Sequence, residues 1–242
     1  MRTSITMGII AASAVTAACG HGRAEDAGPT VSRNYQVGAF RQIEVAGPYD
    51  VQVHTGANPG VTARGGQKLL EHTIVEVKGD KLVIRPESQR GWFHFGWGHH
   101  GNANVAVTVP QLSGATIAGS GDIHVDRVQG GDFEGMVAGS GGLNVDALDV
   151  QQLKLAIGGS GSAKAGNGKA QSARYEIAGS GDVDARNVQT NDVDVSIAGS
   201  GSIRAHASGT AKVSIMGSGD VEVAGGAKCT VSKAGSGDVH CS

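Results

Sequence analysis

The sequence predicts an all-β fold, a parallel β-helix-like solenoid with coils of about twenty residues that turn at Gly-Ser-Gly corners. Three observations lead to this prediction. Glycine supplies 40 of the 242 residues, but without the Gly-X-Y period of collagen. Apolar and polar residues alternate over short segments, which is the period of a β-strand. The tripeptide Gly-Ser-Gly recurs at nearly constant spacing, as in stacked repeats.

The Gly-Ser-Gly tripeptides define the repeat. Apolar residues stand two and four positions before most of the corners, as do Ile177 and Tyr175, and the alternation resumes after the corner, as at Val183. Each coil therefore supplies two short strands to one apolar interior, and neighbouring coils stack as parallel strands about 4.8 Å apart. The corners begin at Gly119, Gly139, Gly159, Gly179, Gly199, Gly217 and Gly235, with spacings of twenty and then eighteen residues.

The N-terminus predicts export. Residues 1–18 combine Arg2 with an apolar stretch and small residues, which is the pattern of a signal peptide. Cys19 follows, so we expect either lipidation of Cys19 after cleavage or an ordinary cut that leaves a plain thiol. Residues 19–33 are polar and aperiodic, which indicates a tether. The predicted location is the cell envelope, as an outer-membrane lipoprotein that faces the periplasm or the surface.

Residues 34–242 are predicted to form a single solenoid domain. Residues 34–110 contain period-2 segments between Gly, Pro and Asn turns, such as Gln42 to Val45 and Lys81 to Ile84, and should form less regular coils. Residues 111–242 contain the regular repeats. No helical pattern of useful length appears in either part.

The corners are interpreted as backbone devices. Glycine permits a positive φ, and the serine between the glycines could form a hydrogen-bonded ladder along the rod. A serine nucleophile would require a strand-to-helix elbow, and no helix is expected after any corner. Calcium binding is the other alternative, but calcium-binding β-rolls have a nine-residue period, so acidic residues after the corner are interpreted as turn caps. These residues are Asp122, Asp182, Asp220 and Asp238.

The two remaining cysteines lie near the C-terminus. Cys229 and Cys241 stand six residues before and after the start of the last corner, both in the inward register. Export favours oxidised cysteines, so we predict that they form a disulfide that holds the last coil, with buried reduced thiols as the alternative.

An aromatic and histidine cluster interrupts the N-terminal coils at residues 91–101. It is predicted to be a loop that acts as a cap over the end of the solenoid or an ordinary hairpin, as a partner-binding surface, or as a site for a soft divalent metal. The predicted partner-binding residues are Trp92, Phe93, His94, Phe95, Trp97, His99 and His100.

Charge limits the possible partners. The formal net charge of -2 and the pI near 6.5 provide no basic field for nucleic acid, and the predicted membrane contact is a lipid anchor alone. We expect no cofactor and no catalytic residue. The remaining histidines are interpreted as solvated surface residues: His54, His72, His124, His206 and His240.

Several short motifs resemble a bacterial family, the putative auto-transporter adhesin head GIN domain. They are the stretch from Phe40 to Val53, the pair Leu69-Leu70, the segment from Val107 to Leu112 and the Gly-Ser-Gly-Asp corners. The resemblance runs from about residue 37 to the C-terminus. It implies an exported or lipid-anchored all-β solenoid without assigned catalytic residues.

These observations predict a non-catalytic structural or binding module of the cell envelope, adhesin-like, whose partner is an unidentified protein or glycan. The alternative is a polysaccharide-binding or polysaccharide-cleaving β-helix enzyme, because such folds often hold long glycans along a groove. An enzyme of this kind should cluster carboxylates and basic residues on one face, and the outward positions of successive coils show no acid-base pair.

Overall fold

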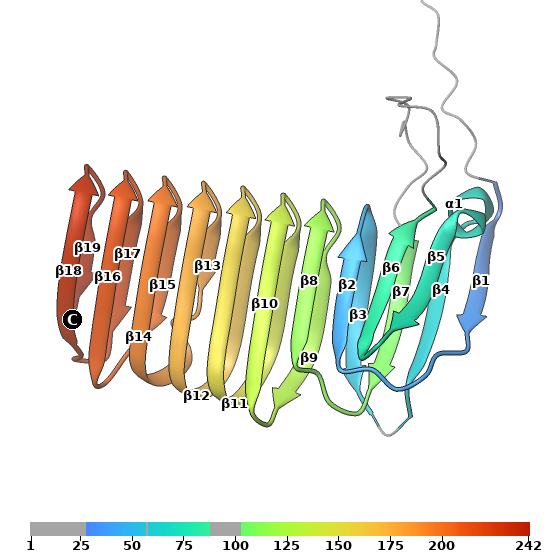
Figure 1. Ribbon diagram of the computed structural model, residues 1–242, viewed down its shortest axis with the longest axis horizontal. Coiled ribbons are helices and arrows are strands. Elements are labelled where there is room, and N and C mark those ends of the chain that lie inside the picture. The colour runs from blue at the N-terminus through green and yellow to red at the C-terminus, as the bar shows by residue number, and fades with distance from the viewer. Residues whose placement is uncertain (1–27, 57, 88–102) are drawn as a thin grey trace, which may run out of the picture.

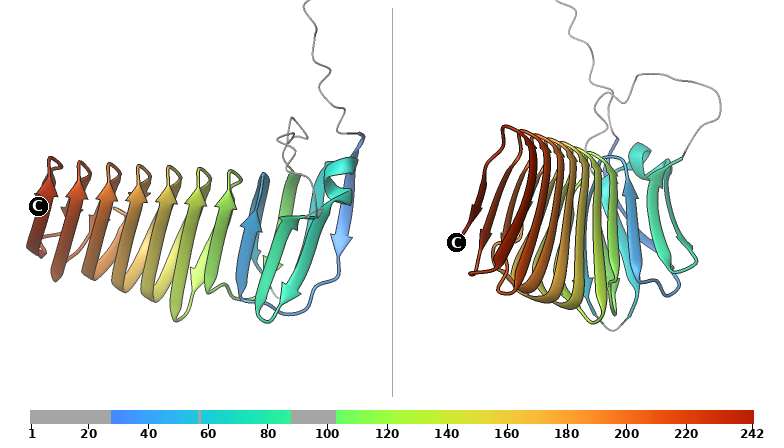
Figure 2. Two further views of the ribbon diagram at one scale, coloured as in Figure 1. Left: turned by 45° about the horizontal axis from the view of Figure 1, so that its top comes forward. Right: turned by 60° about the vertical axis from the view of Figure 1, so that its left-hand side comes forward.

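A computed structural model describes residues 28–56, 58–87 and 103–242 of the chain, and these form a straight stack of β-coils (Figure 1). All of the strands belong to one hydrogen-bonded 19-stranded system. The strands of each regular coil lie on opposite sides of a narrow interior, as the right-hand view of Figure 2 shows, and the apolar residues that face this interior are buried. The predicted parallel solenoid is therefore confirmed.

The regular coils stack in the register that the repeat predicts. Strand β8 enters the first Gly-Ser-Gly corner and β9 leaves it, and each later coil pairs with the previous one in parallel. The column that contains Ile117, Val137 and Ile157 is buried. The strands are β8 (Gly114–Gly119), β9 (Ile123–Gln129), β10 (Asp132–Gly139), β11 (Gly142–Gly159), β12 (Ser162–Gly179), β13 (Asp182–Asp184), β14 (Val188–Gly199), β15 (Ser202–His206), β16 (Thr210–Gly217), β17 (Asp220–Ala224), β18 (Lys228–Gly235) and β19 (Val239–Cys241).

The N-terminal layers do not follow the order of the chain. Strands β2 (Gln42–Ala46) and β3 (Tyr49–Thr55) lie between the layer of β6 (Lys81–Pro86) and β7 (Ala103–Val109) on one side and the β8–β9 layer on the other. The sequence indicated the strands but not this order, because period-2 alternation identifies a strand without naming its neighbour. The turn Gly47-Pro48-Tyr49 occupies the corner of this inserted layer.

Antiparallel strands and a short helix cover the N-terminal end of the stack. Strand β4 (Gly60–Gly66) pairs with β7, and β5 (Thr73–Lys78) pairs with β6. Helix α1 (Gln67–Glu71) buries Leu69 and Leu70 against the core. Five residues are too few to produce a helical period in the sequence, which explains why no helix was predicted.

Strand β1 (Thr30–Tyr35) extends this cover by pairing with β4. It begins four residues before the predicted start of the domain, within the segment interpreted as tether. Its sequence is polar because it is an edge strand, and its residues are exposed or half-buried. Among the described residues, no helix is long and apolar enough to cross a membrane.

Each regular coil has a third stretch, which we call the third side and which is longest in the twenty-residue coils. It is the segment between the strand that leaves one corner and the strand that enters the next. Strands β11 and β12 run through it without a break. In the later eighteen-residue coils the third side is two residues shorter, and Ser208 and Gly209 bridge it through hydrogen bonds to the carbonyls of Thr190 and Asn191.

Candidate functional site

The Gly-Ser-Gly corners are structural devices. Gly179 has a φ of +138°, and a Cβ there would lie 2.2 Å from the carbonyl oxygen of Gly159. A Cβ at Gly181 would lie 2.4 Å from the oxygen of Gly161, so the second glycine is required by close stacking. The corner ladder is formed by the backbone: the N–H of Ser180 donates to the carbonyl of Gly159 at 2.9 Å. The corner serines thus form a ladder along the rod through their backbone N–H groups.

The aspartates after the corners cap the next coil. The backbone N–H of Gly142 donates to Asp122 Oδ1 at 2.6 Å, and the N–H of Asp238 donates to Asp220 Oδ1 at 2.9 Å. These contacts support the turn-cap interpretation over calcium binding. The described part of the chain contains no cluster of three or more metal-binding side chains.

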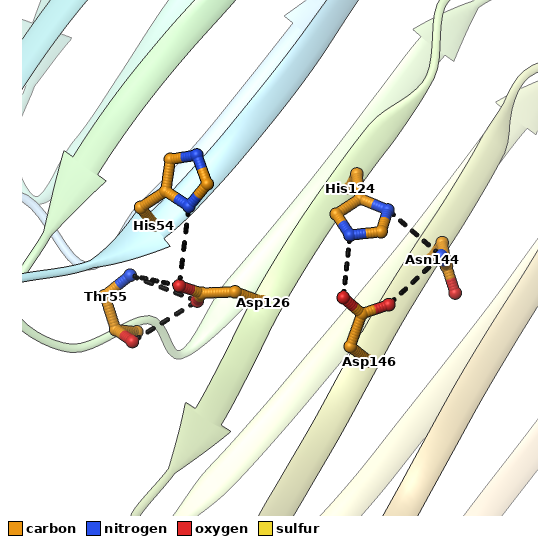
Figure 3. A network of polar contacts seen from close by, with 6 residues as sticks. All are labelled: His54, Thr55, His124, Asp126, Asn144 and Asp146. Atoms are coloured by element: carbon orange, nitrogen blue, oxygen red, sulfur yellow. Dashed lines mark hydrogen bonds and ion pairs between the residues drawn. The ribbon is translucent and has the colours of Figure 1, made fainter.

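Two histidines form polar pairs on the outer face of the second sheet, the sheet of strands that leave the corners. His124 Nε2 lies 2.8 Å from Asp146 Oδ2, and its Nδ1 lies 3.0 Å from the Asn144 amide nitrogen (Figure 3). His54 lies 3.5 Å from Asp126. Both histidines were expected to be solvated, without partners. The twenty-residue repeat already placed His124 and Asp146 in adjacent coils, whereas His54 lies outside the repeat, in the inserted β3.

These pairs do not resemble a catalytic triad. The ring nitrogen of His124 that does not contact Asp146 contacts Asn144, so no nucleophile is bonded to this imidazole. Asp126 accepts hydrogen bonds from the backbone N–H and hydroxyl of Thr55 as well. Both pairs therefore join neighbouring layers across the sheet.

The other histidines have different surroundings. His72 is exposed and lies 3.4 Å from Glu87, and His240 is exposed. His206 is only half-exposed, and its Nδ1 is buried without a hydrogen-bond partner. The prediction of a solvated surface residue is thus wrong for the buried nitrogen of His206.

The outer face of the second sheet is acidic. Among the described residues of the strands that leave the corners, three cations, Lys164, Arg186 and Arg204, share this face with nine carboxylates. A shallow depression near its C-terminal end is lined by Ser202 and His240 together with charged groups of both signs. The carboxylates are those of Asp50, Asp122, Asp126, Asp146, Asp182, Asp184, Asp220, Glu222 and Asp238.

The first sheet consists of the strands that enter the corners. Its outer face carries several ion pairs. Lys154 Nζ donates to Glu134 at 2.8 Å, and Arg174 pairs with Glu176. The hydrogen bond and charge of Glu134 raise the pKa of Lys154, and those of Glu176 raise the pKa of Arg174. Each of these charges is thus engaged by a partner on the same face.

Where a carboxyl pKa departs clearly from its ordinary value, it lies below that value. Partial burial acts to raise the pKa of Asp184, but the hydrogen bonds and charge of Arg186 outweigh it. The hydroxyl of Thr210 lowers the pKa of Asp192, and Lys78 and Arg85 lower that of Glu76. A general acid for glycoside cleavage requires the opposite shift, so these carboxyl groups are unsuited to that role.

The cysteine pair lies in the terminal coil. Cys229 of β18 and Cys241 of β19 are joined by a disulfide across the interior of this coil. The other predicted site residues lie outside the described residues: the lipidation candidate Cys19 and the loop residues Trp92, Phe93, His94, Phe95, Trp97, His99 and His100.

Comparison with known proteins identifies the family of this chain. The family model described as "putative auto-transporter adhesin, head GIN domain" matches residues 39–227. The chain belongs to this family. A search of curated proteins gives no match.

Solved structures of similar fold include two putative adhesins and a putative lipid binding protein. A putative adhesin from Bacteroides fragilis shares 22% identity with a TM-score of 0.79, covering 88% of this chain and 97% of its own. A putative lipid binding protein from Parabacteroides distasonis shares 21% identity with a TM-score of 0.71, covering 89% and 97%. A putative adhesin from Parabacteroides merdae shares 20% identity with a TM-score of 0.67, covering 89% and 97%. At these identities the likeness establishes the fold alone.

Proposed function

We propose that this protein is a non-catalytic, adhesin-like binding module of the bacterial cell envelope. One observation supports this proposal above the others: the rod presents polar side chains in repeated columns, while the groups that resemble catalytic residues are used to join its layers. The serines of the corners, the aspartates after them and the His-Asp pairs all belong to that structural set. The exposed columns that remain are suited to contact an extended partner.

The proposed attachment is a lipid at Cys19. Strand β1 begins at Thr30 at the covered end of the rod, so the preceding segment would hold that end towards the membrane. Eleven residues, 19–29, reach at most about 40 Å when fully extended. The C-terminal coil would then be the end furthest from the anchor. Within this proposal, Trp92 and Trp97 are the candidates for an aromatic contact with the partner.

Two other functions have less support. Polysaccharide cleavage would require a carboxyl group of raised pKa beside a second carboxylate, and the clear carboxyl shifts are downward. One structural neighbour is named a putative lipid binding protein, and lipid binding by this chain would require an apolar groove. The large apolar side chains exposed in the described residues are Met136, Met216 and Val231, and they lie in different coils.

Fractionation and binding of the full chain test this proposal. We expect the protein in the membrane fraction, release of the Cys19→Ala variant from that fraction, and retention of the purified full chain on isolated cell envelopes. Release of reducing ends from envelope glycans by the purified protein would overturn the non-catalytic assignment. Failure of the full chain to bind envelopes or whole cells would overturn the binding function.

A further inference from the structure

We propose that the third side of the long coils binds a neutral, hydroxyl-rich polysaccharide, an inference that rests on the proposed binding function and names its partner class. The surface concerned is the amide face, which consists of outward residues on the third side of four successive coils. Its amide residues are Gln129, Gln151, Asn167, Gln171, Asn187, Gln189 and Asn191.

The amide face is a regular array. Strands β9, β11, β12 and β14 pair in parallel along it, so Gln129, Asp149, Lys169 and Gln189 form one column. All seven amide residues are exposed. Neighbouring strands lie about 4.8 Å apart, so the residues of this column follow one another at that interval, with the amides of Gln129 and Gln189 at its two ends.

The amide groups have unused hydrogen-bonding capacity. A side-chain amide carries two donors and one acceptor oxygen, and amides stacked in register can bond to one another as ladders. No such ladder forms here: of the seven residues of the amide face, all of which the structure describes, only Asn191 uses its side chain, donating to Asp192 Oδ2 at 2.8 Å. The other six are available to a ligand.

The fold does not require this surface. The eighteen-residue coils show that a layer closes with a third side two residues shorter, bridged at Ser208 and Gly209. Buried residues such as Leu148 and Val188 explain the inward half of the longer third side. They do not explain why the outward half carries amides, since any polar residue satisfies an exposed strand position.

The chemistry of the amide face selects a neutral partner. Its only charges are Arg127 and the pair of Lys169 and Asp149, whose charged atoms lie 3.4 Å apart. The acidic second-sheet face would attract cations and repel anions, whereas amides donate and accept without favouring either sign. A sugar hydroxyl also donates and accepts, so the two groups are complementary.

Single contacts of this kind are weak because water competes for each hydrogen bond. A polymer that engages several coils at once gains affinity through its effective concentration at each further site. The proposal therefore concerns a chain laid along or across several layers, and short oligosaccharides should bind far less tightly than the polymer.

Affinity electrophoresis of the full chain tests this inference. The protein is run through native gels that contain amylose, laminarin or mannan as neutral probes, or polygalacturonate as an anionic probe. We expect at least one neutral polymer to retard it. The Gln171→Glu/Gln189→Glu variant should lose about tenfold in affinity, because the N–H donors of two amide groups are removed and two charges are added.

The matched control adds two acidic residues to the outer face of the first sheet. Ser214→Glu/Ser232→Glu alters two exposed positions outside the amide face and should bind as the unaltered protein does. Thermal unfolding by circular dichroism verifies that both variants are folded. Added salt should change the affinity for the neutral polymers very little, because salt screens interactions between charges.

The outcomes separate this inference from the proposed function. If the full chain binds envelopes but no neutral polymer retards it, or if the amide variant binds as tightly as the control, the amide face is not the site. Equal losses in both variants would also overturn it, because added charge alone would explain them. Retardation by polygalacturonate alone would overturn the neutral class of partner.

Discussion

The two ends of the rod are closed in different ways. At the N-terminal end, antiparallel strands and helix α1 lay Leu69 and Leu70 over the core. At the C-terminal end, the interior of the last coil is only partly covered, and Val231 is 46% exposed. A disulfide between Cys229 and Cys241 holds that coil, and Lys233 replaces the apolar residue of its column.

This difference shows two solutions to the same physical problem. A solenoid buries each layer with the next one, so its last layers lack a partner and their strand edges invite association with other chains. The N-terminal end gains a hydrophobic cover. The C-terminal end instead gains a covalent link and a charge, and Lys233 Nζ donates to the carbonyl of Gly237 at 2.6 Å.

The largest expected effect is that of a substitution in the regular coils, which lie between the two ends. Gly179→Ala should destabilise the rod by about 4 kcal/mol, because the new Cβ would meet the Gly159 carbonyl and the backbone would be strained. Thermal unfolding followed by circular dichroism measures the loss. Gly158→Ala is the control, since a Cβ there meets nothing within 4 Å. Equal melting of the two variants would refute the role assigned to the corner.

The hydrophobic cover of the N-terminal end should contribute more to the free energy of unfolding than the disulfide of the C-terminal end. Leu70→Ala removes a fully buried side chain from α1 and should cost about 3 kcal/mol. Urea unfolding measures it, with the exposed Lys68→Ala of the same helix as the control. If Leu70→Ala lowers the free energy of unfolding by less than the disulfide variant described next, the C-terminal end is the one that depends more on its closure.

Removal of the disulfide should act locally. The Cys229→Ser/Cys241→Ser variant should cost about 2 kcal/mol, because the link constrains a short loop in a layer with a partner on one side only. Hydrogen exchange should accelerate in β18 and β19 and stay unchanged in β8 and β9. Accelerated exchange along the whole rod would contradict the view that layers depend only on their neighbours.

A substitution of Lys233 should stabilise the protein, unlike the substitutions described above. Lys233→Ile restores the apolar column and should stabilise the last coil by about 1 kcal/mol while increasing self-association, because an apolar strand edge would be left open. Sedimentation velocity at several concentrations measures association, with Lys228→Ile on the outward side of the same strand as the control. A variant that remains monomeric would show that the charge does not protect this end.

The smallest expected effect is that of pH on the regular coils. The folded pKa of Asp184 lies below its ordinary value of 3.8, so its contribution is present above that value and is lost as the pH falls through the folded pKa. The contribution should be under about 1 kcal/mol, because the pair with Arg186 is partly exposed. Urea midpoints from pH 6 down to pH 2 for the unaltered chain and Asp184→Asn should converge at low pH.

Much of the fold could be predicted because the repeat itself defines the register. A spacing of twenty residues places Ile157 beside Ile177, and alternation then decides which residues are buried. The order of the N-terminal layers could not be predicted, because nothing local in β2 and β3 indicates that two later strands will flank them. The His124–Asp146 pair could have been found from the repeat, since it depends only on adjacent columns.

The amide face was missed for a different reason. Glutamine and asparagine at outward positions look like ordinary solvated residues in a sequence, and the change in spacing from twenty to eighteen residues does not indicate which side of the coil is shortened. Residues such as Gln151 and Gln171 carry no periodic apolar signal of their own. Their significance depends on the hydrogen bonds that they do not make, which only a structure can report.

The inserted β2–β3 layer also determines how the rod can come apart. The segment after β7 must pass this layer to reach β8, so the layer is held between strands that follow it in the chain. Coils can peel away one at a time from the C-terminus, and the edge strand β1 can detach from β4, but β2 and β3 cannot leave until the layers on both sides open together. Pulling the two termini apart should therefore release the inserted layer after its neighbours have opened, in a single step.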